Sequence, residues 1–172
     1  INEILDLSLI ESGKVTLSRE PVSLSEVMLE CRAMVEAQAQ KRGIGMKFPR
    51  FETPYFVQAD RTRVKQVLIN LLFNAVKYNR EGGTITVSCQ VAVSADEVSI
   101  AVADTGLGIS AGDLERVFVP FERLSADQTA IEGTGIGLPL ARAFAEAMSG
   151  KLSASSAPGQ GSCFQSDSAA AI

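Results

Sequence analysis

Polar residues that could bind a ligand line one face of a predicted helix near the middle of the chain. The segment Asp60 to Tyr78 contains no Gly or Pro and begins with a residue type that caps helices. At about 100° per residue, Asn70, Asn74 and Lys77 share a narrow stripe, and Tyr78 follows them. Amide oxygens suit a hard cation and an ammonium group suits phosphate, so the stripe is a candidate ligand site. The alternative is that both amides are merely tolerated on a solvated face.

The opposite side of this helix predicts burial. Its apolar arc consists of Val64, Val67, Leu68, Leu71, Leu72, Ala75 and Val76. Glu and Lys would serve a solvated stripe better, because asparagine side chains compete locally for backbone groups and lower helix propensity. The amides therefore favour a functional reading of the polar stripe.

A second candidate is the run Asp104-Thr-Gly106-Leu-Gly108-Ile109, which directly follows an apolar predicted strand. A carboxylate at a buried strand end is costly unless it is paired or hydrogen-bonded. Glycines allow backbone to approach a flat or charged ligand closely. The alternative is an ordinary strand-to-loop turn in which the aspartate caps the backbone.

A third candidate, Gly133 to Leu138 (GTGIGL), opens the predicted helix at 137–148, with Pro139 in its first turn. Such a helix N-terminus offers N–H donors and a positive dipole end to phosphate oxygens. The spacing matches neither a dinucleotide-binding fingerprint nor a Walker A loop. The polar segment Ser125 to Glu132 between these motifs is either a lid that orders on ligand binding or a surface loop.

Composition narrows the chemistry. The 172 residues are 46% hydrophobic and carry a net charge of −4, which predicts a globular domain and disfavours nucleic acid as a partner. The chain contains no histidine, which excludes Ser-His-Asp catalysis and phosphohistidine formation within it. Its three cysteines are widely spaced, so free thiols in a reducing compartment are expected. We expect no membrane span and no signal peptide, since no apolar run is long enough.

The remaining patterns predict a mixed α/β fold. A helix ending at Gly13 precedes a strand at Lys14 to Arg19, and a capping box at Ser23 to Glu26 opens a helix that Gly43 stops. The expected core face of that helix comprises Val27, Leu29, Cys31, Met34, Val35 and Ala39. Further strands are expected at 44–48, 55–58, 84–91, 98–104, 151–156 and 162–165, with a short helix at 111–118.

Because these strands and helices do not strictly alternate, we predict a two-layer α/β sandwich. Its mixed, mainly antiparallel sheet packs on helices, and a short N-terminal helix is added. Residues 1–13 are expected to end a separate helix, residues 14–166 to form the domain, and residues 167–172 to be a frayed tail.

Five ordered motifs resemble those of sensor histidine kinase ATP-binding domains, within the superfamily that includes type II topoisomerases and heat-shock chaperone ATPases. The motifs resemble the N box, a glycine box, the F box and two further glycine boxes. They are Asn70 to Asn79, Asp104 to Ile109, Phe118 to Arg123, Gly133 to Leu138 and Gly159 to Phe164. The resemblance implies a Bergerat-type sandwich. Residues 1–13 resemble the end of the second helix of the kinase dimerisation domain.

The resemblance also implies a role for each matched residue. Asn70 and Asn74 would bind Mg²⁺, Lys77 and Arg123 would contact phosphate, and Tyr78 would line the pocket. Asp104 would accept from the adenine amine, Gly106 and Gly108 would admit the purine, and Ser162 would hold a water beside it. Gly135, Gly137 and Leu138 would present N–H groups to the phosphates, and Ile109, Gly133 and Thr134 would complete the nucleotide-binding set.

The implied function is transfer of the ATP γ-phosphate to a histidine on a dimerisation helix that this chain lacks. An amide at Asn70, where hydrolysing relatives carry glutamate, implies slow ATP hydrolysis. The implied partners are the dimerisation domain of a homodimeric parent and a response regulator, and the implied location is cytoplasmic. The alternatives are a nucleotide-binding regulatory module without transfer activity and an anti-sigma-type serine kinase.

Overall fold

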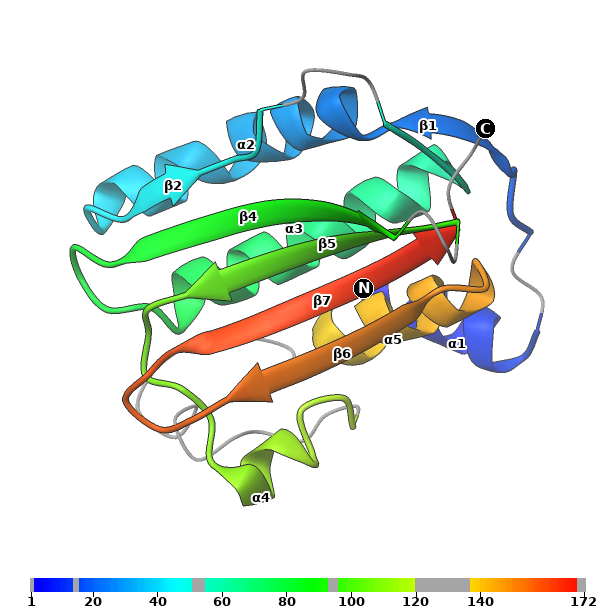
Figure 1. Ribbon diagram of the computed structural model, residues 1–172. Helices are drawn as coiled ribbons and strands as arrows, with labels where there is room; N and C mark the ends of the chain where they lie inside the picture. Colours follow the sequence, from blue (N-terminus) through cyan, green and yellow to red (C-terminus); the bar gives the residue numbers. More distant parts are fainter. Residues whose placement is uncertain (1, 14–15, 51–54, 93–95, 120–136, 170–172) are drawn as a thin grey trace.

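The chain folds into two layers, a five-stranded sheet and the helices that cover one of its faces (Figure 1). The structure is a computed structural model that describes residues 2–13, 16–50, 55–92, 96–119 and 137–169. Helices α3 and α5 pack on the sheet, and α2 packs beside α3. The two-layer α/β sandwich predicted from the sequence is confirmed. None of the helices in these described ranges has the length and apolar character that a membrane span needs.

Most of the expected elements are present, with shifted ends. In chain order they are α1 (Asn2–Glu11), β1 (Glu20–Ser23), α2 (Leu24–Lys41), β2 (Gly45–Lys47), β3 (Phe56–Ala59), α3 (Arg61–Lys77), β4 (Thr84–Ala92), β5 (Glu97–Asp104), α4 (Ala111–Leu114), α5 (Gly137–Ala147), β6 (Lys151–Ser156) and β7 (Ser162–Ala169).

The large sheet has the strand order β2-β4-β5-β7-β6. Only the β2–β4 pair is parallel, and the other neighbours are antiparallel, so the sheet is mixed and mainly antiparallel, as predicted. Strand β5 lies in the middle, where Val102 pairs with Val87 on one side and Phe164 on the other. Strands β1 and β3 form a separate two-stranded antiparallel sheet. Asp104 is the last residue of β5. Because β5 is the central strand, Asp104 lies at the end of the sheet, with loops of the neighbouring strands on both sides.

Helix α3 forms for the reasons expected from its sequence. The Asp60 side chain caps it by accepting a hydrogen bond from the Arg63 backbone N–H at 3.2 Å. All seven residues of the predicted apolar arc are buried. They face the inner side of the sheet, where the alternating residues Val98, Ile100 and Val102 of β5 are also buried. This packing holds the polar stripe of α3 in a fixed orientation.

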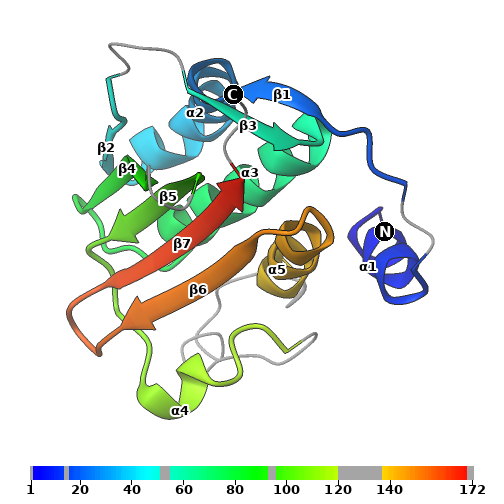
Figure 2. The same cartoon turned by 45° about the vertical axis from the view of Figure 1, so that its right-hand side comes forward.

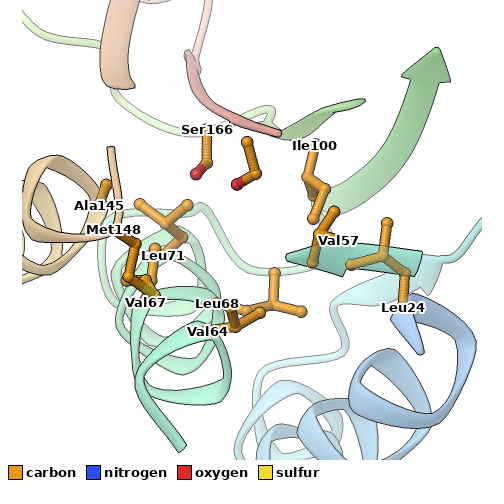
Figure 3. Close-up of a pocket in the computed structure, with 11 residues that line it drawn as sticks. Leu24, Val57, Val64, Val67, Leu68, Leu71, Ile100, Ala145, Met148 and Ser166 are labelled. Atoms are coloured by element: carbon orange, nitrogen blue, oxygen red, sulfur yellow. The ribbon is translucent and has the colours of Figure 1, made fainter. Parts of the chain in front are cut away.

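A cavity of about 20 Å³ remains in this core between α3, α5, β3 and the inner face of β7 (Figure 3). Its lining is mostly apolar, with Val57, Leu68 and Met148 among the wall residues. Ser166 faces the cavity from β7, at an inward position that an apolar side chain would normally occupy. The volume is sufficient for one water molecule.

The strand predicted at Lys14 to Arg19 is wrong over residues 16–19, and residues 14 and 15 lie outside the described ranges. Residues 16–19 have no regular structure, and the strand starts at Glu20. The alternating pattern is overridden because tertiary contacts use the groups that a strand would pair. The Ser18 N–H donates to Asp60 Oδ2 at 2.9 Å, and the Arg19 guanidinium donates to the Ala147 carbonyl at the end of α5.

The predicted core face of α2 was partly wrong. Leu29 and Met34 are 68% and 51% exposed, whereas Leu24 and Met28 are buried. The buried residues of α2 recur at the spacing of a single stripe, and the two mispredicted residues lie outside it. Ser23 stands at the N-cap as predicted, but it makes no side-chain capping bond, so the capping box is not formed.

The frayed tail was also wrong where the structure describes it. Asp167 to Ala169 belong to β7 and pair with β5, with Asp167 opposite Ser99. The Ser99 hydroxyl donates to Asp167 Oδ1 at 2.5 Å. Backbone pairing and this side-chain bond order a segment that has no apolar pattern, which is why periodicity missed it.

Candidate functional site

The polar stripe of α3 lies next to the first residue of α5. The Asn70 amide nitrogen donates to the Gly137 carbonyl at 3.1 Å, which ties the middle of α3 to the start of the glycine-led helix. Within the described ranges, neither the Asn70 carbonyl oxygen nor the Asn74 side chain has a hydrogen-bond partner. The Lys77 ammonium lies 4.8 Å from the centre of the Tyr78 ring. Two amide oxygens one helical turn apart thus remain available to a ligand beside an ammonium group.

Asp104 ends β5 with its carboxylate held from one side. Its Oδ1 accepts from the Gly106 N–H at 2.9 Å and from the Ser162 N–H at 3.2 Å. No described residue donates to Oδ2. Burial raises the pKa of this carboxyl group above its usual value, and the two backbone hydrogen bonds partly oppose that rise. A half-satisfied buried carboxylate is suited to accept one more hydrogen bond from outside the chain.

Close backbone packing explains the glycines that follow Asp104. A Cβ atom on Gly106 would overlap the Tyr78 carbonyl, and one on Gly108 would overlap the Ala157 carbonyl. Gly108 also has a φ of +74°, which side chains disfavour. The Leu107 N–H donates to the Tyr78 carbonyl at 3.2 Å. These glycines therefore dock the loop against the end of α3 and against the β6–β7 turn, a structural need separate from any contact with a purine.

Ser156, the last residue of β6, closes the site from the other side. Its hydroxyl accepts from the Ile109 N–H at 2.7 Å and contacts the Gly161 carbonyl at 2.8 Å and the Ser162 hydroxyl at 2.9 Å. The sequence prediction included Ile109 and Ser162 but missed Ser156. A serine in a serine-rich strand carries no distinguishing signal.

Asn79 is a second residue that the sequence prediction missed. It is 3% exposed, and its Oδ1 accepts from the Arg80 N–H at 2.9 Å and from the Thr105 hydroxyl at 3.2 Å. Its amide nitrogen donates to the Thr84 carbonyl at 3.1 Å. The signal was present, because an Asn directly after a helix end commonly bonds nearby backbone.

Only part of the second glycine motif lies in the described ranges. Gly137 starts α5 with no atom near the position of a Cβ, and Leu138 is buried. The predicted site residues outside the described ranges are Arg123, Gly133, Thr134 and Gly135. The segment Ser125 to Glu132 also lies outside them.

The described site thus joins three motifs, with α3 in the middle. Asn70 links α3 to Gly137, and Tyr78 links it to Leu107. Its donor set is chemically suited to a magnesium-bound adenine nucleotide, since amide oxygens are hard ligands and a carboxylate accepts from an exocyclic amine. Among the described residues, no group of three or more His, Cys, Asp or Glu side chains could hold a metal ion. A metal here would depend on amide and phosphate oxygens.

A family model described as "Histidine kinase-, DNA gyrase B-, and HSP90-like ATPase" matches residues 59–167. The chain belongs to this family. The matched range begins just before α3 and ends within β7, and it includes every residue of the site described above.

Known relatives are similar along most of the chain. An uncharacterised sensor-like histidine kinase of Rhizobium meliloti is 36% identical over 162 residues, which are 94% of this chain and 30% of that protein. The non-motile and phage-resistance protein of Caulobacter vibrioides is 37% identical over 164 residues, 94% of this chain and 19% of that protein. The cell-division control histidine kinase PdhS of Brucella canis is 35% identical over 170 residues, which cover 94% of this chain and 16% of that protein. The chain spans less than a third of each relative.

Solved histidine kinase structures share the fold. Full-length ShkA in complex with AMPPNP superposes with a TM-score of 0.86 at 26% identity, covering 99% of this chain and 35% of that one. The nucleotide-free catalytic domain of ThkA gives a TM-score of 0.76 at 29% identity. The match covers 88% of this chain and 95% of the ThkA chain. ThkA in complex with the response regulator TrrA gives a TM-score of 0.73 at 26% identity. That match covers 97% of this chain and 48% of the ThkA chain. The predicted relationship to histidine kinase catalytic domains is confirmed.

Proposed function

We propose that this chain is the ATP-binding catalytic domain of a two-component sensor histidine kinase. It binds Mg²⁺-ATP and transfers the γ-phosphate to a histidine of a dimerisation helix. The observation that carries the proposal is Asp104, whose Oδ1 is fixed by two backbone N–H groups while Oδ2 is left to a ligand. The similarity to ShkA, which was solved with AMPPNP, supports an adenine nucleotide as that ligand.

In this proposal Asp104 reads adenine. Its Oδ2 accepts a hydrogen bond from the exocyclic amine, which guanine replaces with a carbonyl oxygen that cannot donate. Gly106, Gly108 and Ile109 form the adjoining wall, and Ser162 holds a water beside the purine. Tyr78 closes the pocket from the end of α3.

The stripe of α3 serves the phosphates. The carbonyl oxygens of Asn70 and Asn74 hold Mg²⁺, and Lys77 contacts a phosphate oxygen. When bound, the metal neutralises charge on the phosphates. The N–H groups of Gly137 and Leu138 face the phosphates from the start of α5. The resemblance implies that Gly133, Thr134 and Gly135 extend this set and that Arg123 contacts the terminal phosphate.

Transfer requires an acceptor outside the 172 residues, because they contain no histidine. Asn70 is a poor base, so water is not activated and ATP hydrolysis is slow without the acceptor. Catalysis then depends on positioning and on charge neutralisation at the γ-phosphate. The structure of ThkA with its response regulator supports a receiver domain as the next acceptor.

Helix α1 is, in this proposal, the end of a dimerisation helix of a homodimeric parent. It lies against α5 (Figure 2). Leu5 and Leu9 on α1 are 58% and 42% exposed, as expected if other parts of the parent cover them. We place the domain in the cytoplasm, where ATP is available, and its three free cysteines fit a reducing compartment.

Two measurements test the function. Calorimetry should detect binding of a non-hydrolysable ATP analogue, tighter with Mg²⁺ than without. Incubation with labelled ATP and the purified histidine-bearing segment of the parent should transfer label in an acid-labile form. Binding without transfer would favour a regulatory module, and an acid-stable product would favour a serine kinase. Absence of adenine nucleotide binding would overturn the proposal.

A further inference from the structure

Arg42 holds the end of the helix that carries the candidate site. It stands at the C-terminal end of α2, and its guanidinium reaches the last turn of α3. It donates to the carbonyls of Val76 and Asn79, and to that of Lys77 at 3.1 Å. Its Nε pairs with Glu81 at 3.1 Å, and its own carbonyl accepts from the Gly82 N–H at 3.0 Å.

The chemistry of a helix end explains this arrangement. The last carbonyls of a helix have no partners within the helix, and the negative end of the helix dipole attracts a cation. A guanidinium has five N–H donors in a planar fork, so one side chain satisfies carbonyls that point in different directions. Lysine carries its three donors on one nitrogen and lacks this planar fork. The ion pair with Glu81 adds little, since that carboxylate side chain is 75% exposed.

Asn79, whose carbonyl Arg42 bonds, also docks the Asp104 loop, and so does its neighbour Tyr78. The Tyr78 carbonyl, between the Lys77 and Asn79 carbonyls, accepts from the Leu107 N–H at 3.2 Å. The Asn79 side chain accepts from the Thr105 hydroxyl at 3.2 Å. A continuous chain of hydrogen bonds therefore runs from the end of α2, through the end of α3, to the loop that follows Asp104.

We propose that Arg42 is a positioning residue for nucleotide binding. By fixing the carbonyls at the end of α3, it sets the position of the loop that carries Asp104 and Gly106. It acts through Tyr78 and Asn79 and touches no ligand itself. This inference rests on the proposed nucleotide-binding function, but its effect on the loop is measurable without nucleotide.

The test compares arginines at opposite ends of one helix pair. Arg42→Met keeps an unbranched apolar stem and removes every donor. The matched control is Arg61→Met, because Arg61 also joins α3 to α2, through Glu30 at 3.0 Å, but does so at the other end. A second control, Glu81→Gln, removes the exposed ion pair and leaves the bonds from Arg42 to the carbonyls.

Three readouts follow. We expect Arg42→Met to weaken binding of a Mg²⁺–ATP analogue about tenfold and to speed hydrogen exchange at the Leu107 amide. Both controls should stay near wild type in both measurements, with thermal unfolding recorded for each variant. With the histidine-bearing segment supplied, the KM for ATP should rise while kcat changes little.

The outcomes are distinct. Unchanged affinity for the analogue in Arg42→Met, or an equal loss of affinity in Arg61→Met, would mean that Arg42 contributes only to helix packing. Either result would overturn the inference. If the wild type bound no adenine nucleotide, the proposed function would fail, and exchange at Leu107 would still decide the role of Arg42. If Arg42→Met does not fold, Arg42→Lys is used in its place. We expect this variant to lose affinity for the Mg²⁺–ATP analogue several-fold. Wild-type affinity in Arg42→Lys would overturn the inference that a guanidinium is needed.

Discussion

Replacing Asp104 with asparagine tests the adenine assignment with the least change in shape. Oδ1 accepts two backbone hydrogen bonds, from Gly106 and Ser162, and an amide oxygen can keep both. The amide nitrogen must then take the place of Oδ2. An acceptor that faces the adenine amine becomes a donor, so two donors would meet.

The expected loss follows from the kind of bond removed. A hydrogen bond to a charged group contributes about 1.5–3 kcal/mol, which corresponds to about 10–100-fold in affinity for ATP. Guanine presents a carbonyl oxygen where adenine has its amine, so affinity for GTP should rise relative to ATP. Calorimetry with both nucleotides measures the ratio. Unchanged ATP affinity would refute the reading of Oδ2 as the adenine acceptor.

The same substitution should alter the dependence of stability on pH. Burial raises the folded-state pKa of Asp104 above its ordinary value of 3.8, so folding favours the protonated form. Wild-type stability from this group is therefore present at low pH and is lost as pH rises through the folded-state pKa. Asp104→Asn lacks this loss and should gain stability relative to wild type over that interval. Chemical denaturation at several pH values measures the difference in free energy of unfolding between the variant and wild type. If the variant's advantage shrank as pH rises, the expected direction would be contradicted.

Three further substitutions or treatments probe the metal, the core and the thiols. Asn74→Ala should weaken binding of the Mg²⁺–ATP analogue about tenfold and metal-free binding much less, by calorimetry, and equal losses would assign Asn74 to the fold. Ser166→Val should fill the internal cavity and raise the free energy of unfolding by about 1 kcal/mol in denaturant titration. A lower stability would instead indicate that the hydroxyl holds a buried water. Burial raises the pKa of the Cys31 thiol to about 12, so at pH 8 a thiol reagent should label Cys89 and Cys163 well before Cys31. Early labelling of Cys31, seen by peptide mapping, would show that α2 opens.

Sequence reasoning succeeded where a pattern is local and repeated. The apolar arc of α3 recurs at the helical period over its whole length, and the structure buries all of it. Reasoning failed where tertiary contacts override a local pattern. Ser18 belongs to an alternating run, yet its N–H bonds Asp60 instead of a neighbouring strand. On α2, Leu29 is as apolar as Leu24, and only the position of the neighbouring layer decides which one is buried.

The sequence alone determined the two-layer class, the polar stripe on α3, the motifs that mark the family and the absence of histidine from these 172 residues. These follow from residue type, spacing and composition, which are properties of the chain before it folds. Only the tertiary structure decided that Asn70 meets Gly137, that Gly106 packs on the Tyr78 carbonyl, and that Arg42 caps α3 from a neighbouring helix. Such contacts join residues tens of positions apart, and packing of the two layers selects them, so no local pattern carries them.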